Sequence, residues 1–110
     1  MKVLLGLIFL TLSVTIASAN EFRVEGYGIW IFAHQKFKEV KLGGRVDGGR
    51  SCGTLVITAA AETASGERIN LKAVAHDAGR STIIQGESKA VSGGVRIWTV
   101  TDVKVLCRNP

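Results

Sequence analysis

Proline and aromatic residues are scarce in this sequence, which has one proline and 6% Phe, Trp and Tyr among 110 residues. It contains no low-complexity tract, internal repeat or linker. The balance of 46% hydrophobic to 21% charged residues is typical of a globular chain and excludes a disordered one. A chain of this length has room for one domain, which excludes a large multi-domain enzyme.

Long hydrophobic runs are absent except at the N-terminus. There, Lys2 precedes an apolar run over residues 3–17, and Ala17-Ser18-Ala19 supplies the small residues of a cleavage site. This pattern is typical of a secretory signal peptide. The alternative is an uncleaved membrane anchor, but the run is shorter than the roughly 20 apolar residues that a span needs. We therefore expect a signal peptide at 1–19, a mature domain at 20–110 without a transmembrane segment, and a periplasmic or secreted location.

Cysteine is also rare, and the two residues present are Cys52 and Cys107. Export would carry them into an oxidising compartment, where we expect them to form one disulfide. Closing that loop would stabilise the fold by roughly 4 kcal/mol through the entropy of the unfolded chain. The alternative, a reactive or metal-binding thiol pair, lacks both a C-x-x-C spacing and neighbouring histidines.

Basic residues are in modest excess over acidic residues. The net charge is +5 for the whole chain, and removing Lys2 with the signal peptide lowers it by one. The local excess of cations consists of Lys36, Lys38, Lys41, Arg45 and Arg50. Such a cluster is compatible with an anionic partner and equally with a solvated face. No aromatic platform is interleaved with it, so we do not expect nucleic-acid binding.

Short runs with a period of two, separated by glycine-bearing turns, fill the rest of the sequence. They predict strands at residues 22–32, 37–46, 54–62, 68–76, 82–91 and 95–107. The run at 54–62 is apolar on both faces, as in a central strand. We therefore expect an all-β fold, a small antiparallel immunoglobulin-like sandwich of about six or seven strands with one disulfide.

The last predicted strand changes parity along its length. Trp98 and Val100 share one parity, whereas Val103, Val105 and Cys107 share the other, which predicts a β-bulge near Thr101 and Asp102. The predicted core consists of Leu55, Ile57, Ile69, Leu71, Ile83, Trp98, Val100 and Val103.

Residues 44–57, 71–79 and 98–107, together with Gly66, resemble small exported bacterial domains of the FxLYD type. Residues 73–77 stand where the family has Phe-x-Leu-Tyr-Asp, and Asp77 matches it. The resemblance implies an immunoglobulin-like sandwich. It implies little chemistry, because such domains are largely uncharacterised envelope modules and one fold serves many functions.

Candidate catalytic motifs are few. Residues 49–53 spell G-x-S-x-G around Ser51, but no helix pattern follows and the adjacent Cys52 is expected in a disulfide, so we do not expect a nucleophile elbow. The only histidines, His34 and His76, have no spacing that places them on one element as metal ligands. We expect no catalytic residue, metal or cofactor.

The densest apolar run of the mature chain spans residues 27–32. It forms either a strand buried on both faces or, if one parity is exposed, a docking edge beside the cations. The candidate partner-binding residues are Tyr27, Trp30, Lys36, Lys38, Lys41 and Arg45.

The sequence therefore predicts a non-enzymatic exported module that acts by binding or structural association in the cell envelope. The partner would be an envelope or extracellular protein or an anionic polymer. The alternative is a small inhibitor or binder of an extracytoplasmic enzyme or an anionic envelope polymer.

Overall fold

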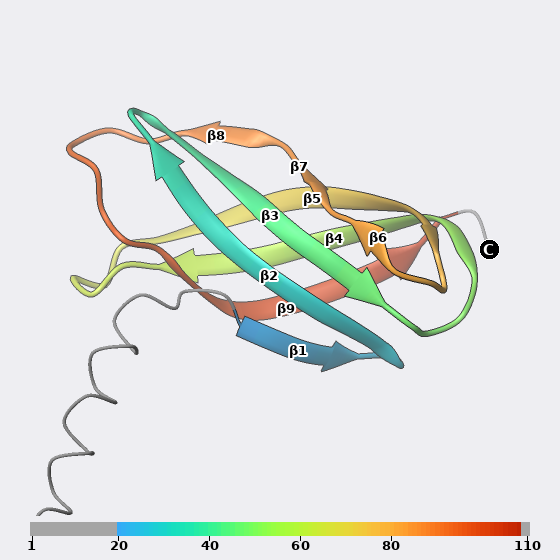
Figure 1. The fold of residues 1–110 in the computed structure, drawn as a ribbon. Coiled ribbons are helices and arrows are strands. Elements are labelled where there is room, and N and C mark those ends of the chain that lie inside the picture. Colours follow the sequence, from blue (N-terminus) through green and yellow to red (C-terminus); the bar gives the residue numbers. More distant parts are fainter. Residues whose placement is uncertain (1–19, 109–110) are drawn as a thin grey trace, which may run out of the picture.

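The computed structural model describes residues 20–108, and the predicted signal peptide at residues 1–19 lies outside this part of the chain. All regular structure in residues 20–108 is β-strand (Figure 1). The strands are β1 (Asn20–Val24), β2 (Tyr27–Lys36), β3 (Glu39–Asp47), β4 (Cys52–Glu62), β5 (Arg68–Ala78), β6 (Thr82–Ile83), β7 (Gln85–Gly86), β8 (Ser88–Ala90) and β9 (Thr99–Cys107). The all-β prediction is confirmed, but residues 20–108 form nine strands, because two of the predicted strands are divided.

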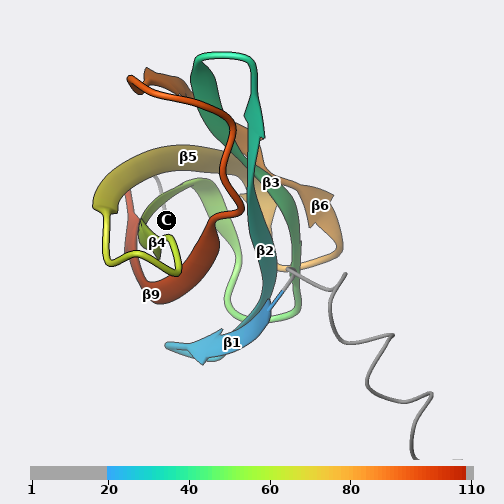
Figure 2. The same ribbon diagram turned by 90° about the vertical axis from the view of Figure 1, so that its left-hand side faces the viewer.

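The strands form two antiparallel sheets that pack as a sandwich. Sheet A has the order β1-β2-β3, and both β6 and β8 pair with β3. Sheet B has the order β7-β5-β4-β9. Figure 2 shows the two layers from one end, with β5, β4 and β9 as a curved layer beside β2 and β3. The small antiparallel sandwich expected from the sequence is therefore confirmed.

The first predicted strand, at residues 22–32, is interrupted by a hairpin turn. Glu25 and Gly26 have φ angles of 50° and 86°, and positive φ at both central positions is what a type I′ turn requires. Glutamate seldom adopts this conformation, so the sequence carries only a weak turn signal here. The single strand predicted at this place is therefore wrong, and β1 and β2 form a hairpin.

The predicted strand at residues 82–91 is divided because this segment alternates between the sheets. β6 pairs with β3, β7 pairs with β5, and β8 pairs with β3 again. Gly86 lies against the backbone of Leu42, where a Cβ would come within 2.4 Å of the Leu42 carbonyl oxygen. The segment thus joins the two sheets along one side of the sandwich.

The core lies between the sheets. Six of the predicted core residues are buried, namely Leu55, Ile57, Leu71, Trp98, Val100 and Val103. Ile69 is partly buried against this cluster. Ile83 is a wrong prediction, because its side chain is 70% exposed while Ile84 is buried. Ile83 pairs with Arg45 on the outside of sheet A, and the chain then turns inward, where the Ile84 amide donates to the carbonyl of Gly44.

The predicted bulge is present in β9. Ala60 is opposite Asp102 and Ala61 is opposite Val100, so Thr101 is the extra residue. This residue changes the parity of the strand, which allows Val100 on one side of the bulge and Val103 on the other to face the core.

Residues 95–98 were predicted as strand, but β9 begins only at Thr99. The buried Gln35 side chain bonds to this segment instead. Its Oε1 accepts from the Arg96 amide and from Nε1 of Trp98, and its Nε2 donates to the carbonyls of Phe37 and Gly94. These four hydrogen bonds satisfy a buried amide group that would otherwise be costly.

The predicted disulfide is also present. Cys52 begins β4 and Cys107 ends β9, and their sulfur atoms are 2.04 Å apart. Near the other end of β9, the side chain of Asn20 donates to the carbonyl of Val100, which links β1 to β9 across the two sheets. Within residues 20–108, no helix has the length and apolarity needed to span a membrane.

Candidate functional site: the aromatic face of sheet A

The run at residues 27–32 is neither wholly core nor wholly exposed. Ile29 and Ile31 on β2 are buried, whereas Trp30 and Phe32 between and beyond them are 44% and 37% exposed. Strand alternation therefore places two aromatic rings on the outside of sheet A. Tyr27, which we expected to contribute to a docking edge, is 1% exposed and belongs to the core. Its parity is that of Ile29, so it cannot contact a partner from this position.

The exposed side of β2 is flanked by β1 and β3, which pair with β2 on either side. In Figure 1, β2 and β3 cross in front of sheet B. Trp30 is paired with Glu21 on β1 and with Arg45 on β3. Phe32 is opposite Gly43, and His34 is opposite Lys41. We refer to the outward-facing residues of β2 and β3 as the aromatic face; they are Trp30, Phe32, His34, Lys41, Gly43 and Arg45.

Two adjacent glycines shape this face. A Cβ at Gly43 would come within 2.7 Å of Cζ of Phe32, so the Phe32 ring covers the position that a side chain would fill. Gly44 has a φ of 142°, and a Cβ there would lie 1.9 Å from the Trp30 carbonyl oxygen. The result is a hollow of about 300 Å³ lined by Trp30, Phe32, Gly44 and Arg45.

The cations expected from the sequence lie beside these rings or farther along the same two strands. Arg45 lines the hollow, and its Nε is 3.1 Å from Oδ2 of Asp47. Lys36 is the last residue of β2 and is opposite Glu39. Lys38 lies in the turn that follows, with its ammonium 5.6 Å from the centre of the Phe37 ring. Within residues 20–108, Lys36 and Lys41 take part in no salt bridge. Five of the six candidate residues therefore lie on this face or at the hairpin that ends it.

Sequence reasoning missed two contributors to the face. Phe32 shares the parity of Trp30 on β2, a signal that was readable from the alternation of the run. Ile83 extends the face on β6 beyond Arg45, and nothing in the local sequence distinguishes it from Ile84. Only the pairing of β6 with β3 shows which of the two isoleucines faces outward.

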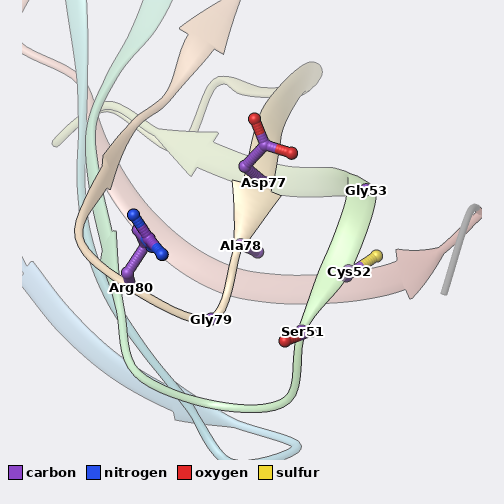
Figure 3. A pocket seen from close by; sticks show the side chains of 7 residues that line it. All are labelled: Ser51, Cys52, Gly53, Asp77, Ala78, Gly79 and Arg80. Atoms are coloured by element: carbon purple, nitrogen blue, oxygen red, sulfur yellow. The ribbon is translucent and has the colours of Figure 1, made fainter.

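A second hollow lies at the disulfide end of the sandwich (Figure 3). It is lined by Ser51, Cys52, Gly53, Asp77, Ala78, Gly79 and Arg80. Figure 3 shows the side chains of Ser51, Asp77 and Arg80 pointing in different directions around it. Ser51 lies just before strand β4, whereas a nucleophile elbow would place it between a strand and a helix. These polar groups do not form an arrangement for acyl transfer, and no histidine is among the lining residues.

The two histidines lie on opposite sides of the sandwich. His34 faces outward from β2 in sheet A, and His76 faces outward from β5 in sheet B. Among residues 20–108, no group of three or more His, Cys, Asp and Glu side chains lies close enough together to hold a metal ion.

The outer face of sheet B has a different chemistry from the aromatic face. Its central row places Val74 on β5, Val56 on β4 and Leu106 on β9 side by side. The next row consists of Lys72, Thr58 and Lys104. Within residues 20–108, the outward positions of β5, β4 and β9 carry no Phe, Trp or Tyr ring, so this face offers matched control positions for experiments on sheet A.

In comparisons with known proteins, no protein-family model, curated protein or solved structure matches the chain.

Proposed function

We propose that this chain is exported and acts as a non-enzymatic binding module in the cell envelope or outside the cell, with the aromatic face as its contact surface. The observation that carries the proposal is the grouping of Trp30, Phe32 and Arg45 around one hollow, beside Lys41 and the hairpin lysines. Tryptophan and arginine are enriched at the energetic centres of interfaces, and lysines at the rim steer an anionic partner.

Export is supported by the signal-peptide pattern at residues 1–19 and by the disulfide between Cys52 and Cys107. Disulfides persist in oxidising compartments and are rare in the cytosol. Intact-mass analysis of protein isolated from cells tests this part of the proposal. We expect a chain that begins at Asn20 and lacks two hydrogens relative to the reduced form. A cytoplasmic chain that retains Met1 would contradict it.

Binding is tested by co-sedimentation of the purified, oxidised protein with an envelope fraction from the organism that encodes it. We expect Trp30→Thr and Phe32→Thr to reduce the bound fraction, because both remove an exposed ring from the aromatic face. Leu106→Thr, which removes an exposed apolar side chain from sheet B, is the matched control. Equal binding by all four proteins would contradict the assignment of the face.

Two further substitutions test the non-enzymatic part of the proposal. Ser51→Ala and His76→Ala should leave any measured activity intact, because neither side chain lies in a catalytic arrangement. Loss of activity with an unchanged melting temperature would contradict this. If the captured partner is an extracytoplasmic enzyme that loses activity on binding, the chain is an inhibitor, the alternative that the sequence leaves open.

A further inference from the structure

We propose that the aromatic face binds an acidic polysaccharide, a chain of pyranose rings that carries carboxylate groups. This inference rests on the proposed binding function and specifies the chemistry of its ligand. It draws on the spacing of the rings, the bare backbone beside them, and the cations farther along the same strands.

The two rings are placed to contact successive sugar units. Trp30 and Phe32 are two residues apart on β2, so their side chains leave the same face about 7 Å apart along the strand. Each is partly exposed, which leaves part of each ring open to a ligand. One side of a pyranose ring presents mainly C–H groups, and this side packs against an aromatic ring while the hydroxyl groups at its edge remain free to hydrogen-bond.

The hollow between the rings and β3 gives a sugar ring access to the backbone. Gly44 lines the hollow and brings no side chain to it, whereas the Phe32 ring covers Gly43. Arg45 lines the same hollow, and its bond to Asp47 holds the guanidinium in position. A guanidinium carries several N–H donors and no acceptor, which suits the oxygen-rich edge of a sugar.

The cations extend the face in one direction along the strands. On β2 the outward positions after Phe32 are His34 and Lys36, and Lys41 lies opposite His34 on β3. The ammonium groups of Lys36 and Lys41 form no salt bridge within residues 20–108. A chain lying along β2 would therefore stack on the rings at one end and place its carboxylates against these lysines at the other.

The composition of the face favours a narrow charged ligand such as a polymer strand. From their exposed fractions, Trp30 and Phe32 together present roughly 200 Å² of aromatic surface. Charged residues surround the rings on β1 and β3, namely Glu21, Lys41 and Arg45. This combination fits a narrow, charged ligand better than a second protein surface.

The test measures binding of the purified, oxidised protein to sodium alginate, a polymer of pyranose carboxylates, by isothermal titration calorimetry. Dextran supplies sugar rings without charge, and poly-glutamate supplies carboxylates without rings. We expect binding to alginate to exceed binding to either control polymer. Trp30→Thr keeps a good strand former at the position and should weaken alginate binding by about tenfold, the upper range for one stacked ring. Lys41→Gln should weaken it by about threefold.

Leu106→Thr and Lys104→Gln make the same chemical changes on the outer face of sheet B, and both should leave the affinity unchanged. Equal binding to poly-glutamate and alginate would overturn the polysaccharide assignment, because charge alone would then explain it. Failure to bind alginate would also overturn the carboxylate-polymer assignment.

A second measurement separates this proposal from the proposed function. The envelope fraction is treated with protease or with periodate, which cleaves vicinal diols of sugars, before co-sedimentation. Binding that depends on Trp30, survives protease and is lost after periodate supports a polysaccharide. Binding that depends on Trp30 but is lost after protease identifies a protein partner, which overturns this inference and leaves the proposed function standing.

Discussion

Trp98 in the interior and Trp30 on the aromatic face stand in opposite surroundings despite similar neighbours in the sequence. Each follows an isoleucine, Ile97 or Ile29. Trp98 is 1% exposed and donates its Nε1 hydrogen to Gln35, while Ile97 is 75% exposed. At the other site the order is reversed, because Ile29 is buried and Trp30 is 44% exposed.

The difference shows that the local course of the backbone, and not the residue type, decides which side chain serves the core: Trp30 points outward by the alternation of β2, whereas Trp98 precedes β9 and points inward to Gln35. At Trp98 the aromatic ring fills the interior and its polar atom is satisfied there, so its contribution is to stability. At Trp30 the isoleucines fill the interior, and the ring is left on a face lined with cations. We therefore expect substitutions in the two regions to separate stability from binding.

The largest expected contrast is between Trp98→Ala and Trp30→Ala. Trp98→Ala should lower the free energy of unfolding by about 3 to 5 kcal/mol, because it leaves a cavity and removes a partner of the buried Gln35. Trp30→Ala should cost less than about 1 kcal/mol, since the ring is half exposed. Urea unfolding monitored by circular dichroism measures both. Similar losses of unfolding free energy for the two variants would contradict the difference between the interior and the aromatic face.

The disulfide, like Trp98, should contribute to stability and not to binding. The double variant Cys52→Ala/Cys107→Ala should lose about 4 kcal/mol of stability, since the unfolded chain regains the entropy of a 55-residue loop. Affinity for the envelope fraction, measured at a temperature where the variant remains folded, should be unchanged, because both cysteines lie outside the aromatic face. A weaker affinity in that folded variant would show that the two regions are coupled.

Gly43 and Gly44 of β3 differ in what a new side chain would meet, so their substitutions should differ in stability. Gly44→Ala should cost about 1 to 3 kcal/mol, because its φ of 142° is unfavourable for alanine and the new Cβ would overlap the Trp30 carbonyl. Gly43→Ala displaces only the far end of the movable Phe32 ring, so the cost should stay below about 1 kcal/mol. Chemical unfolding of the pair provides the measurement, and the reverse order would contradict the packing described here.

The smallest effect on stability is expected at the lysines near the β2–β3 hairpin. Lys36→Glu/Lys38→Glu should change the free energy of unfolding by about 0.5 kcal/mol or less but should slow association with an anionic partner. Binding of the unchanged protein should weaken with salt, because the Debye length falls from about 10 Å at 0.1 M to about 3 Å at 1 M. Surface plasmon resonance with immobilised envelope material gives these rates. Lys72→Glu/Lys104→Glu on sheet B is the control, and equal slowing by both pairs would indicate a general charge effect.

Features that depend on the local residue pattern or on the number of cysteines could be predicted from the sequence alone. Alternation predicted β4 and β5 and their large core residues Leu55, Ile57 and Leu71, because large apolar side chains of one parity must be buried. The change of parity after Trp98 predicted the bulge at Thr101. Two cysteines in one chain permit a single intramolecular pairing, so the bridge was predictable once an oxidising destination was inferred.

Where both faces of a predicted strand are apolar, the face that points outward depends on the tertiary structure. In residues 27–32 the choice between Tyr27 and Trp30 depends on the pairing of β2 with β1 and β3, and at residues 83–84 it depends on a segment that alternates between two sheets. The hairpin at Glu25 likewise requires a conformation that its residue type does not favour. The aromatic face is formed by strands that meet only in the fold, and contacts between residues distant in sequence are set by the packing of the whole chain.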